Sequence, residues 1–208
     1  MNTIITIGRQ CGSGGREIGN KLSELLGIKC YDKELLQRAA KESGLSEEIM
    51  KNNDEVPTSS FLYNLVMDSY GFGSGVGGFT DMPLSNKVFL AQFDAIKKIA
   101  DEGPCIMVGR CSDYALAERD NVLNIFVYAD LEQRIERIMK VYNVNADKAK
   151  DVITKKDKQR ASYYNFYTSK KWGRADSYDL CINSSVLGID GSAKLISQYI
   201  QDFETRVK

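Results

Sequence analysis

Residues 8–17, with the sequence Gly-Arg-Gln-Cys-Gly-Ser-Gly-Gly-Arg-Glu, are the stretch best suited to chemistry on a phosphate. They follow a β-branched run at residues 4–7 and precede an amphipathic helical pattern. In such an order, N–H groups of the loop and of the helix N-terminus point toward one spot and bind an anion. The alternative is a tight turn without a ligand. We predict a phosphate site formed by Arg9, Gly12, Ser13, Gly14, Gly15, Arg16 and Glu17.

The loop departs from a standard P-loop, G-x-x-x-x-G-K-[ST], in which the lysine contacts the outer phosphates and the hydroxyl binds Mg²⁺. Registered on its glycines, the chain has Gly15 in place of the lysine and Glu17 in place of the hydroxyl residue. Arg9 and Arg16 flank the loop, and we expect one of them to supply the missing cation, because a guanidinium binds two phosphate oxygens at once. Glu17 either binds a metal ion or caps the helix. Alternatively, Arg9 and Arg16 are ordinary surface arginines without a role in phosphate binding.

Further basic residues occur at positions that suit phosphate chemistry. Arg110 follows a buried apolar run and a glycine, whereas Arg38 lies inside a predicted helix and could equally be solvated. The stretch 155–160 carries several cations and is either a solvated helix face or a source of charge for phosphoryl transfer. An aromatic cluster follows at residues 163–167, with Trp172. We expect these rings to pack the basic segment against the protein rather than to stack on a nucleotide base.

Composition narrows the possible chemistry. The chain of 208 residues has 28 basic and 28 acidic side chains, so no global field indicates a nucleic acid or membrane partner. It contains no histidine, which excludes Ser-His and Cys-His catalysis and most zinc sites. Five cysteines without CxxC spacing are typical of reduced thiols, and no apolar run is long enough to span a membrane. We therefore expect a cytoplasmic protein that uses Lys, Arg, carboxylates, backbone amides or an oxygen-held metal.

Short apolar runs alternate with amphipathic stretches along the chain, which predicts an α/β protein with a parallel sheet. Strands are expected at 3–7, 28–31, 105–108, 122–128 and 178–183, and helices at 15–26, 33–43, 86–101, 112–119, 131–141, 146–164 and 191–206. Ligands of such folds bind at the carboxyl ends of the strands. Four positions follow the ends of predicted strands: the loop at 8–15, Asp32, Gly109–Arg110 and Asp130. Asp32 is also placed to cap the helix 33–43.

Residues 45–86 interrupt the alternation and predict a flexible insertion. A helix is expected near 45–50 and apolar helical spacing recurs at 61–67. Five glycines in residues 70–79, including the 71–78 loop, favour a mobile segment. Two interpretations of this segment stay open: a functional lid and a plain disordered loop.

At these motifs the chain resembles the cytidylate kinase-like proteins, a variant-loop branch of the nucleoside monophosphate kinases. Residues 9–18 have the branch's R-Q-x-G-S-G-G-R-E-I sequence. The family's D-T-G-x-x-Y-R element corresponds to Asp32 through Arg38, with its spacing kept, and D-G-R-D corresponds to residues 108–111 around Arg110. The lid pattern R-x-x-x-D-x-x-R is partly kept in Asp157 and Arg160, and residues 178–183 resemble the D-A-x-x-I-D-T strand.

The resemblance implies one P-loop kinase domain over residues 1–208. It would have a three-layer fold with a five-stranded parallel sheet, an acceptor-side insertion at 45–86 and a basic lid-like arm at 142–174. The implied activity is transfer of the ATP γ-phosphoryl group, with Mg²⁺, to CMP or another nucleoside monophosphate. The resemblance assigns acceptor binding to Asp32, Arg38 and Arg110, the lid to Asp157 and Arg160, and catalysis to Arg16, Arg110 and Arg160. Two alternatives stay open: a catalytically weak nucleotide-binding or regulatory protein, and a kinase for a non-nucleotide acceptor.

Overall fold

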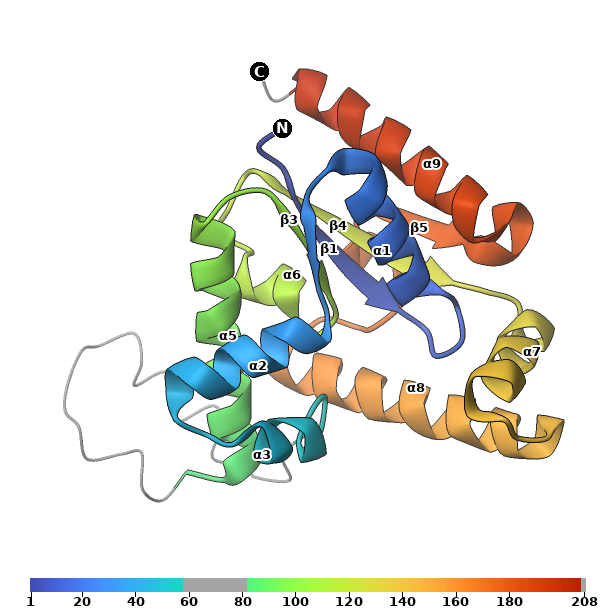
Figure 1. The fold of residues 1–208 in the computed structure, drawn as a ribbon, viewed down its shortest axis with the longest axis horizontal. Coiled ribbons are helices and arrows are strands. Elements are labelled where there is room, and N and C mark those ends of the chain that lie inside the picture. Colours follow the sequence, from blue (N-terminus) through green and yellow to red (C-terminus); the bar gives the residue numbers. More distant parts are fainter. Residues whose placement is uncertain (58–81, 207–208) are drawn as a thin grey trace.

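A computed structural model describes residues 1–57 and 82–206 of the chain (Figure 1). All five strands of its sheet are parallel, in the spatial order β2-β3-β1-β4-β5. The strands are β1 (Ile4–Arg9), β2 (Lys29–Tyr31), β3 (Cys105–Val108), β4 (Val122–Tyr128) and β5 (Leu180–Asn183). The helices are α1 (Gly15–Leu26), α2 (Lys33–Ser43), α3 (Glu47–Asn52), α5 (Leu84–Asp101), α6 (Ser112–Ala115), α7 (Leu131–Tyr142), α8 (Ala146–Thr168) and α9 (Ser184–Arg206).

Helices cover both faces of the sheet, which confirms the predicted three-layer α/β fold. Side chains of β1 alternate between the faces, as strand geometry requires. Ile5 and Ile7 pack in one core with residues of α1 and α9, whereas Ile4 packs in a second core with residues of α2, α5 and α6. The central position of β1 therefore fixes the start of the glycine loop against two cores.

Glycines end the first two helices where the sequence predicted. Gly27 after α1 and Gly44 after α2 have left-handed backbones, and each donates its N–H to a carbonyl of the preceding turn. The prediction that Asp32 caps α2 is wrong: its side chain makes no capping hydrogen bond. The carboxylate pairs instead with Arg16 and Arg110, and these charged partners offer it a stronger interaction than backbone N–H groups do.

Three helices differ from expectation by more than two residues at one end. The terminal helix begins at Ser184 rather than 191, because α9 runs through a non-helical Gly188 that kinks it. The stretch 112–119 forms only the single turn of α6, and α8 continues to Thr168. Tyr167 near that end stacks on Phe89 at 3.8 Å between ring centroids, and burial of Tyr163 and Tyr164 beside it confirms that the aromatic arm packs.

The described part of the predicted insertion runs from α2 back toward the sheet. Helix α3 packs Met50 against Leu36 of α2 and Val88 of α5. The following residues 53–57 approach the carboxyl ends of β1 and β3, where Glu55 contacts Arg9. The expectations for 61–67 and for the glycine-rich loop at 71–78 lie outside the described residues.

Helix α8 lies beside the carboxyl ends of the strands, with α7 leading into it (Figure 1). Nη1 of Arg160 on α8 donates to the carbonyl of Arg9 at 3.3 Å, so the predicted lid arm contacts the last residue of β1. None of the helices among residues 1–57 and 82–206 has the length and apolarity that crossing a bilayer demands.

Candidate active site

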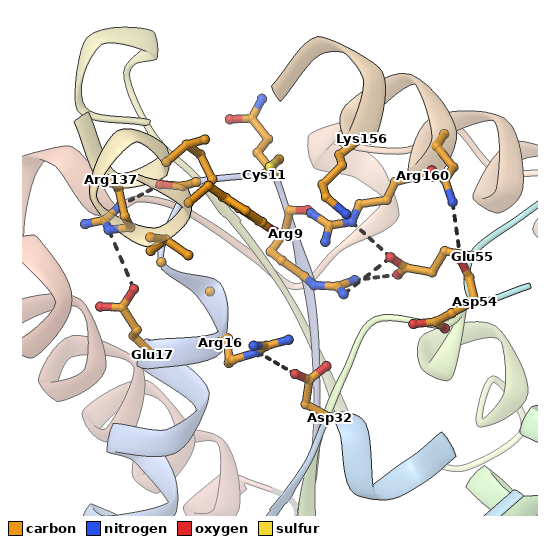
Figure 2. Close-up of a pocket in the computed structure, with 18 of the residues that line it drawn as sticks. Arg9, Cys11, Arg16, Glu17, Asp32, Asp54, Glu55, Arg137, Lys156 and Arg160 are labelled. Atoms are coloured by element: carbon orange, nitrogen blue, oxygen red, sulfur yellow. Dashed lines mark hydrogen bonds and ion pairs between the residues drawn. The ribbon is translucent and has the colours of Figure 1, made fainter. Parts of the chain in front are cut away.

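A cavity of about 400 Å³ opens at the carboxyl ends of β1, β2 and β3, within the range of small-molecule sites. It brings together most of the predicted site residues: Arg9, Gly12, Gly14, Gly15, Arg16, Glu17, Asp32, Arg110 and Arg160. Figure 2 shows side chains from the glycine loop, α8 and the turn after α3 converging on it. Ser13, Arg38 and Asp157 do not line it.

The glycine loop leads from β1 into α1 as a compact turn. Gly14 has a left-handed backbone with φ of 80°, which glycine adopts without strain, and α1 begins at the next residue. Ser13 is fully buried, and its hydroxyl donates to the carbonyl of Gln10 at 2.9 Å. Ser13 therefore holds the turn closed and presents no hydroxyl to the cavity.

Arg9 explains why residue 15 is a glycine. A Cβ at position 15 would lie only 2.6 Å from Cβ of Arg9 and 3.1 Å from its Cγ. The stem of Arg9 thus occupies the space from which a side chain at position 15 would start. The sequence showed that the lysine is missing, and the structure shows that an arginine from the end of β1 fills the adjacent space.

Glu55 joins two of the cavity arginines. Its carboxylate accepts from Nη1 of Arg9 at 2.6 Å and from Nε of Arg160 at 3.0 Å (Figure 2). All three side chains are mostly buried, with exposed fractions of 11%, 12% and 17% for Arg9, Glu55 and Arg160. Burial would raise the pKa of the Glu55 carboxyl, but Arg9 and Arg160 outweigh it and lower the pKa below its ordinary value.

Arg110 is held by two carboxylates. Its Nε and Nη2 donate to the two oxygens of Asp54, each at 2.8 Å, and its Nη1 lies 3.2 Å from Asp32. Burial would lower the pKa of Arg110, but Asp54 raises it above the ordinary value, so the side chain stays charged. Arg110 also has a left-handed backbone at φ of 57°, a conformation that costs energy in a residue with a Cβ.

Arg16 and Glu17 lie on the first turn of α1 and line the cavity (Figure 2). Arg16 pairs with Asp32 and is 56% exposed, so it has more freedom than Arg9. Glu17 is 55% exposed and lies 3.7 Å from Nε of Arg137 on α7. Nη1 of Arg137 donates in turn to the carbonyl of Gly12 at 2.6 Å, which ties α7 to the glycine loop.

Asp157 fastens α8 to the glycine loop rather than lining the cavity. Its Oδ1 accepts the backbone N–H of Cys11 at 2.7 Å, and its Oδ2 pairs with Arg134 of α7. Nε of Arg134 donates to the carbonyl of Cys11 at 2.8 Å, so both sides of the Cys11 peptide are bound. The predicted lid residue thus has a positioning contact in this structure.

Arg38 lies away from the cavity. Its guanidinium pairs with Glu42 of its own helix and with Glu102 after α5, and the side chain is 37% exposed. The spacing from Asp32 that resembles the family motif is present, but the described structure does not bring the two side chains together.

Asp54 and Glu55 also line the cavity, although neither was among the predicted site residues. They stand in the polar break between α3 and Pro57, where two adjacent acids give no signal of a buried role. Their arginine partners are 46 to 105 residues away, so no local spacing reveals the contacts. Arg134 and Arg137 lie in the predicted helix 131–141, outside the motifs, and their bonds to the glycine loop are likewise long-range.

No group of three metal-ligating side chains occurs within the described ranges 1–57 and 82–206. Mg²⁺ does not require one, because it commonly binds one or two carboxylates, waters and the substrate phosphates. Of the cavity carboxylates, Asp32, Asp54 and Glu55 pair closely with arginines. Glu17, exposed at the end of the glycine loop with Arg137 at 3.7 Å, fits this manner of binding.

The chain is similar to known proteins in sequence and in fold. A profile of the cytidylate kinase-like family matches residues 4–186. An uncharacterized protein from Eubacterium ventriosum aligns over 96% of this chain and 99% of its own, with 28% identity and a TM-score of 0.72.

More distant solved structures share the fold. Shikimate kinase from Bacteroides thetaiotaomicron aligns over 97% of this chain and 99% of its own, with 11% identity and a TM-score of 0.56. A gluconokinase from Sinorhizobium meliloti aligns over 100% and 98%, with 11% identity and a TM-score of 0.51. The fold is therefore that of the P-loop kinases. Among curated protein sequences, none matches the chain.

Proposed function

The chain belongs to the cytidylate kinase-like family, and from that premise we propose that it transfers the γ-phosphoryl group of ATP to a nucleoside monophosphate. One observation carries the proposal: the glycine loop and the arginines Arg9, Arg110 and Arg160 converge on a single cavity at the strand ends. Phosphoryl transfer demands little of a protein beyond positioning and neutralisation of charge on the transferring oxygens. A glycine cradle with several buried guanidinium groups supplies both.

Arg9 takes the role of the absent P-loop lysine in this proposal. It leaves β1 at the loop, its stem packs over Gly15, and its guanidinium is mostly buried in the cavity. Arg16 is more exposed and paired with Asp32, so it is suited to a substrate group nearer the opening. Arg160 on α8 adds a second cation beside Arg9, since both contact the same carboxylate of Glu55.

Arg110 and Asp32 form the acceptor side. Arg110 already binds both oxygens of a carboxylate, and a phosphate of the acceptor would be held by the same two N–H groups. Asp32 orients Arg110 from the end of β2. Glu17 would hold Mg²⁺ together with the ATP phosphates, and the bound ion would neutralise charge on the phosphate oxygens.

A second candidate is a kinase for a hydroxyl acceptor, favoured by the position of Asp32. Its carboxylate is buried, lines the cavity and is flanked by two arginines. A carboxylate placed in this way can orient or deprotonate an attacking hydroxyl, which a phosphate acceptor does not need. Shikimate kinase and gluconokinase share the fold, so their substrates belong in the test.

The test is ADP release from ATP and Mg²⁺ with a panel of acceptors: CMP, UMP, AMP, GMP, shikimate and gluconate. Turnover with a nucleoside monophosphate supports the first proposal, and turnover confined to a hydroxy acid supports the second. Absence of turnover across the panel, with ATP still raising the melting temperature, would leave a nucleotide-binding protein of weak catalysis. If ATP and inorganic phosphate leave the melting temperature unchanged, the phosphate site itself is contradicted.

A further inference from the structure

The carboxylate of Glu55 sits where several N–H donors converge. It accepts from Nη1 of Arg9 at 2.6 Å, from Nε of Arg160 at 3.0 Å and from the backbone N–H of Arg110 at 3.4 Å. A second guanidinium nitrogen of Arg9, Nη2, lies at 3.4 Å. These donors come from β1, from α8 and from the residues after β3, and Figure 2 shows the side chains of Arg9 and Arg160 aimed at the same group.

Such a donor set is built for an anion with several oxygens. Two guanidinium groups and a strand-end N–H surround one position beside the glycine loop, and all three arginines are mostly buried. Buried cations that lie close together repel one another unless an anion lies between them. An anion at this position relieves that repulsion, and Glu55 supplies the negative charge here.

The turn that carries Glu55 is weakly held by its own backbone. Helix α3 ends at Asn52, and the two backbone hydrogen bonds that follow, from Asp54 to Lys51 and from Val56 to Asn53, are long at 3.5 and 3.4 Å. Glu55 itself has a left-handed backbone with φ of 53°, which disfavours a residue with a Cβ. The contacts of Asp54 and Glu55 with the arginines thus supply much of what keeps residues 53–56 in the cavity.

We propose that the donors around Glu55 form a subsite for a phosphoryl group, and that Glu55 is its internal occupant in the ligand-free protein. The inference rests on the proposed function for the identity of the ligand, a terminal phosphoryl group of a substrate. Binding of that group transfers Arg9 and Arg160 from the carboxylate to phosphate oxygens, displaces Glu55 from them and leaves the 53–56 turn held through Asp54 and Arg110. No covalent bond forms or breaks in the exchange.

This arrangement makes Glu55 a competitor of the substrate. A ligand binds only the fraction of molecules in which Glu55 has left the arginines, so the apparent affinity is reduced by that fraction. Removing the charge at position 55 raises the fraction of molecules that can bind the ligand. The effect is opposite to that of a residue that positions the arginines for the substrate, because loss of a positioning residue weakens binding.

The test is a calorimetric titration of the full chain with pyrophosphate, comparing wild type, Glu55→Gln and the control Glu48→Gln. Glu48 is an exposed acid of α3 outside the cavity. We expect Glu55→Gln to bind pyrophosphate about tenfold more tightly than wild type, as the fraction of molecules that can bind it rises toward one. The control is expected to bind as wild type does. Unchanged or weaker binding by Glu55→Gln would overturn the proposal.

A second measurement needs no variant. Hydrogen exchange of a peptide covering residues 50–57 is expected to speed up when wild-type protein is saturated with pyrophosphate, while the glycine loop becomes more protected. Slower exchange of both segments would show that Glu55 stays in place, against the proposal. Because neither measurement requires turnover, a protein that fails every acceptor but shows these changes keeps the subsite and loses only the proposed kinase activity.

Discussion

The carboxylate of Glu55 lies 2.6 Å from Nη1 of Arg9, although 46 residues separate the two in the sequence. The contact joins the end of the central strand β1 to the turn that follows α3. The glycine loop and the described start of the predicted insertion are therefore one electrostatic unit. A change in either residue affects both the stability of the fold and the charge of the cavity.

Breaking this pair from the arginine side is expected to destabilise the fold. Arg9→Met leaves a buried carboxylate with Arg160 as its remaining charged side-chain partner at contact distance, and we expect the free energy of unfolding to fall by about 3 kcal/mol. Arg9→Met/Glu55→Gln removes both charges and should lose less than the sum of the single variants. Urea unfolding at neutral pH measures all three. Strict additivity would show that the two side chains do not interact.

Stability should also depend on the ionisation of Glu55. Burial would raise the pKa of its carboxyl, but the neighbouring arginines lower it below the ordinary value of 4.5. With a lower pKa in the folded state, ionised Glu55 stabilises the fold above about pH 4.5, and this contribution is lost as the pH falls further. The unfolding free energy of wild type minus that of Glu55→Gln should therefore decrease between about pH 6 and pH 3. A difference that is independent of pH would contradict the lowered pKa.

Restoring the P-loop lysine should harm this protein. A side chain at position 15 would start 2.6 Å from Cβ of Arg9, so Gly15→Lys must displace the stem of that arginine. We expect it to lower the free energy of unfolding by about 2 kcal/mol, as overpacking does, and to reduce transfer activity. Asn20→Lys, on the exposed face of the same helix, is the matched control and should be near neutral. A gain of activity in Gly15→Lys would show that Arg9 does not take the place of the lysine.

Local signals explain how much of the fold was predictable. Helices α1 and α2 begin and end where expected, because each is followed by a glycine that adopts a left-handed backbone. The order of short apolar runs indicated five parallel strands, and the sheet confirms it. The start of α9 was not predictable in this way, because a kink at the non-helical Gly188 separates its first residues from the helix expected from 191.

The candidate site was predictable only where a motif marks it. The glycine loop, Asp32 and Arg110 stand at strand ends, and the cavity unites them. Asp54 and Glu55 follow a short helix in a polar segment, and tertiary contacts alone place them on the arginines. The same contacts explain Asp32, which the sequence predicted as a helix cap and which pairs with two arginines instead.

Loosening the contact between α8 and the glycine loop should weaken both stability and nucleotide binding. Asp157→Asn removes the negative charge that the Cys11 N–H and Arg134 share, and the free energy of unfolding is expected to fall by about 2 kcal/mol. Because the Cys11 peptide borders the cavity, the melting-temperature shift on adding ATP should also shrink. Asp151→Asn, an exposed acid on the same helix, controls for the change of charge. An unchanged ATP shift in Asp157→Asn would limit this residue to a role in stability.

Arg38 and Arg110 should behave differently although the family motifs assign both to the acceptor. Arg110 lines the cavity and binds Asp54 through two N–H groups, a geometry that an ammonium group cannot copy. Arg110→Lys is expected to reduce kcat/KM for the acceptor about 10²-fold, as loss of one preorganised charged donor does. Arg38 pairs with Glu42 and Glu102 outside the cavity, so Arg38→Ala should change kcat/KM by less than about twofold, as surface substitutions do. Steady-state kinetics with the acceptor identified in the panel measures both variants, with circular dichroism to verify folding. If Arg38→Ala lowers kcat/KM as much as Arg110→Lys, then α2 must move on acceptor binding and bring Arg38 into the cavity.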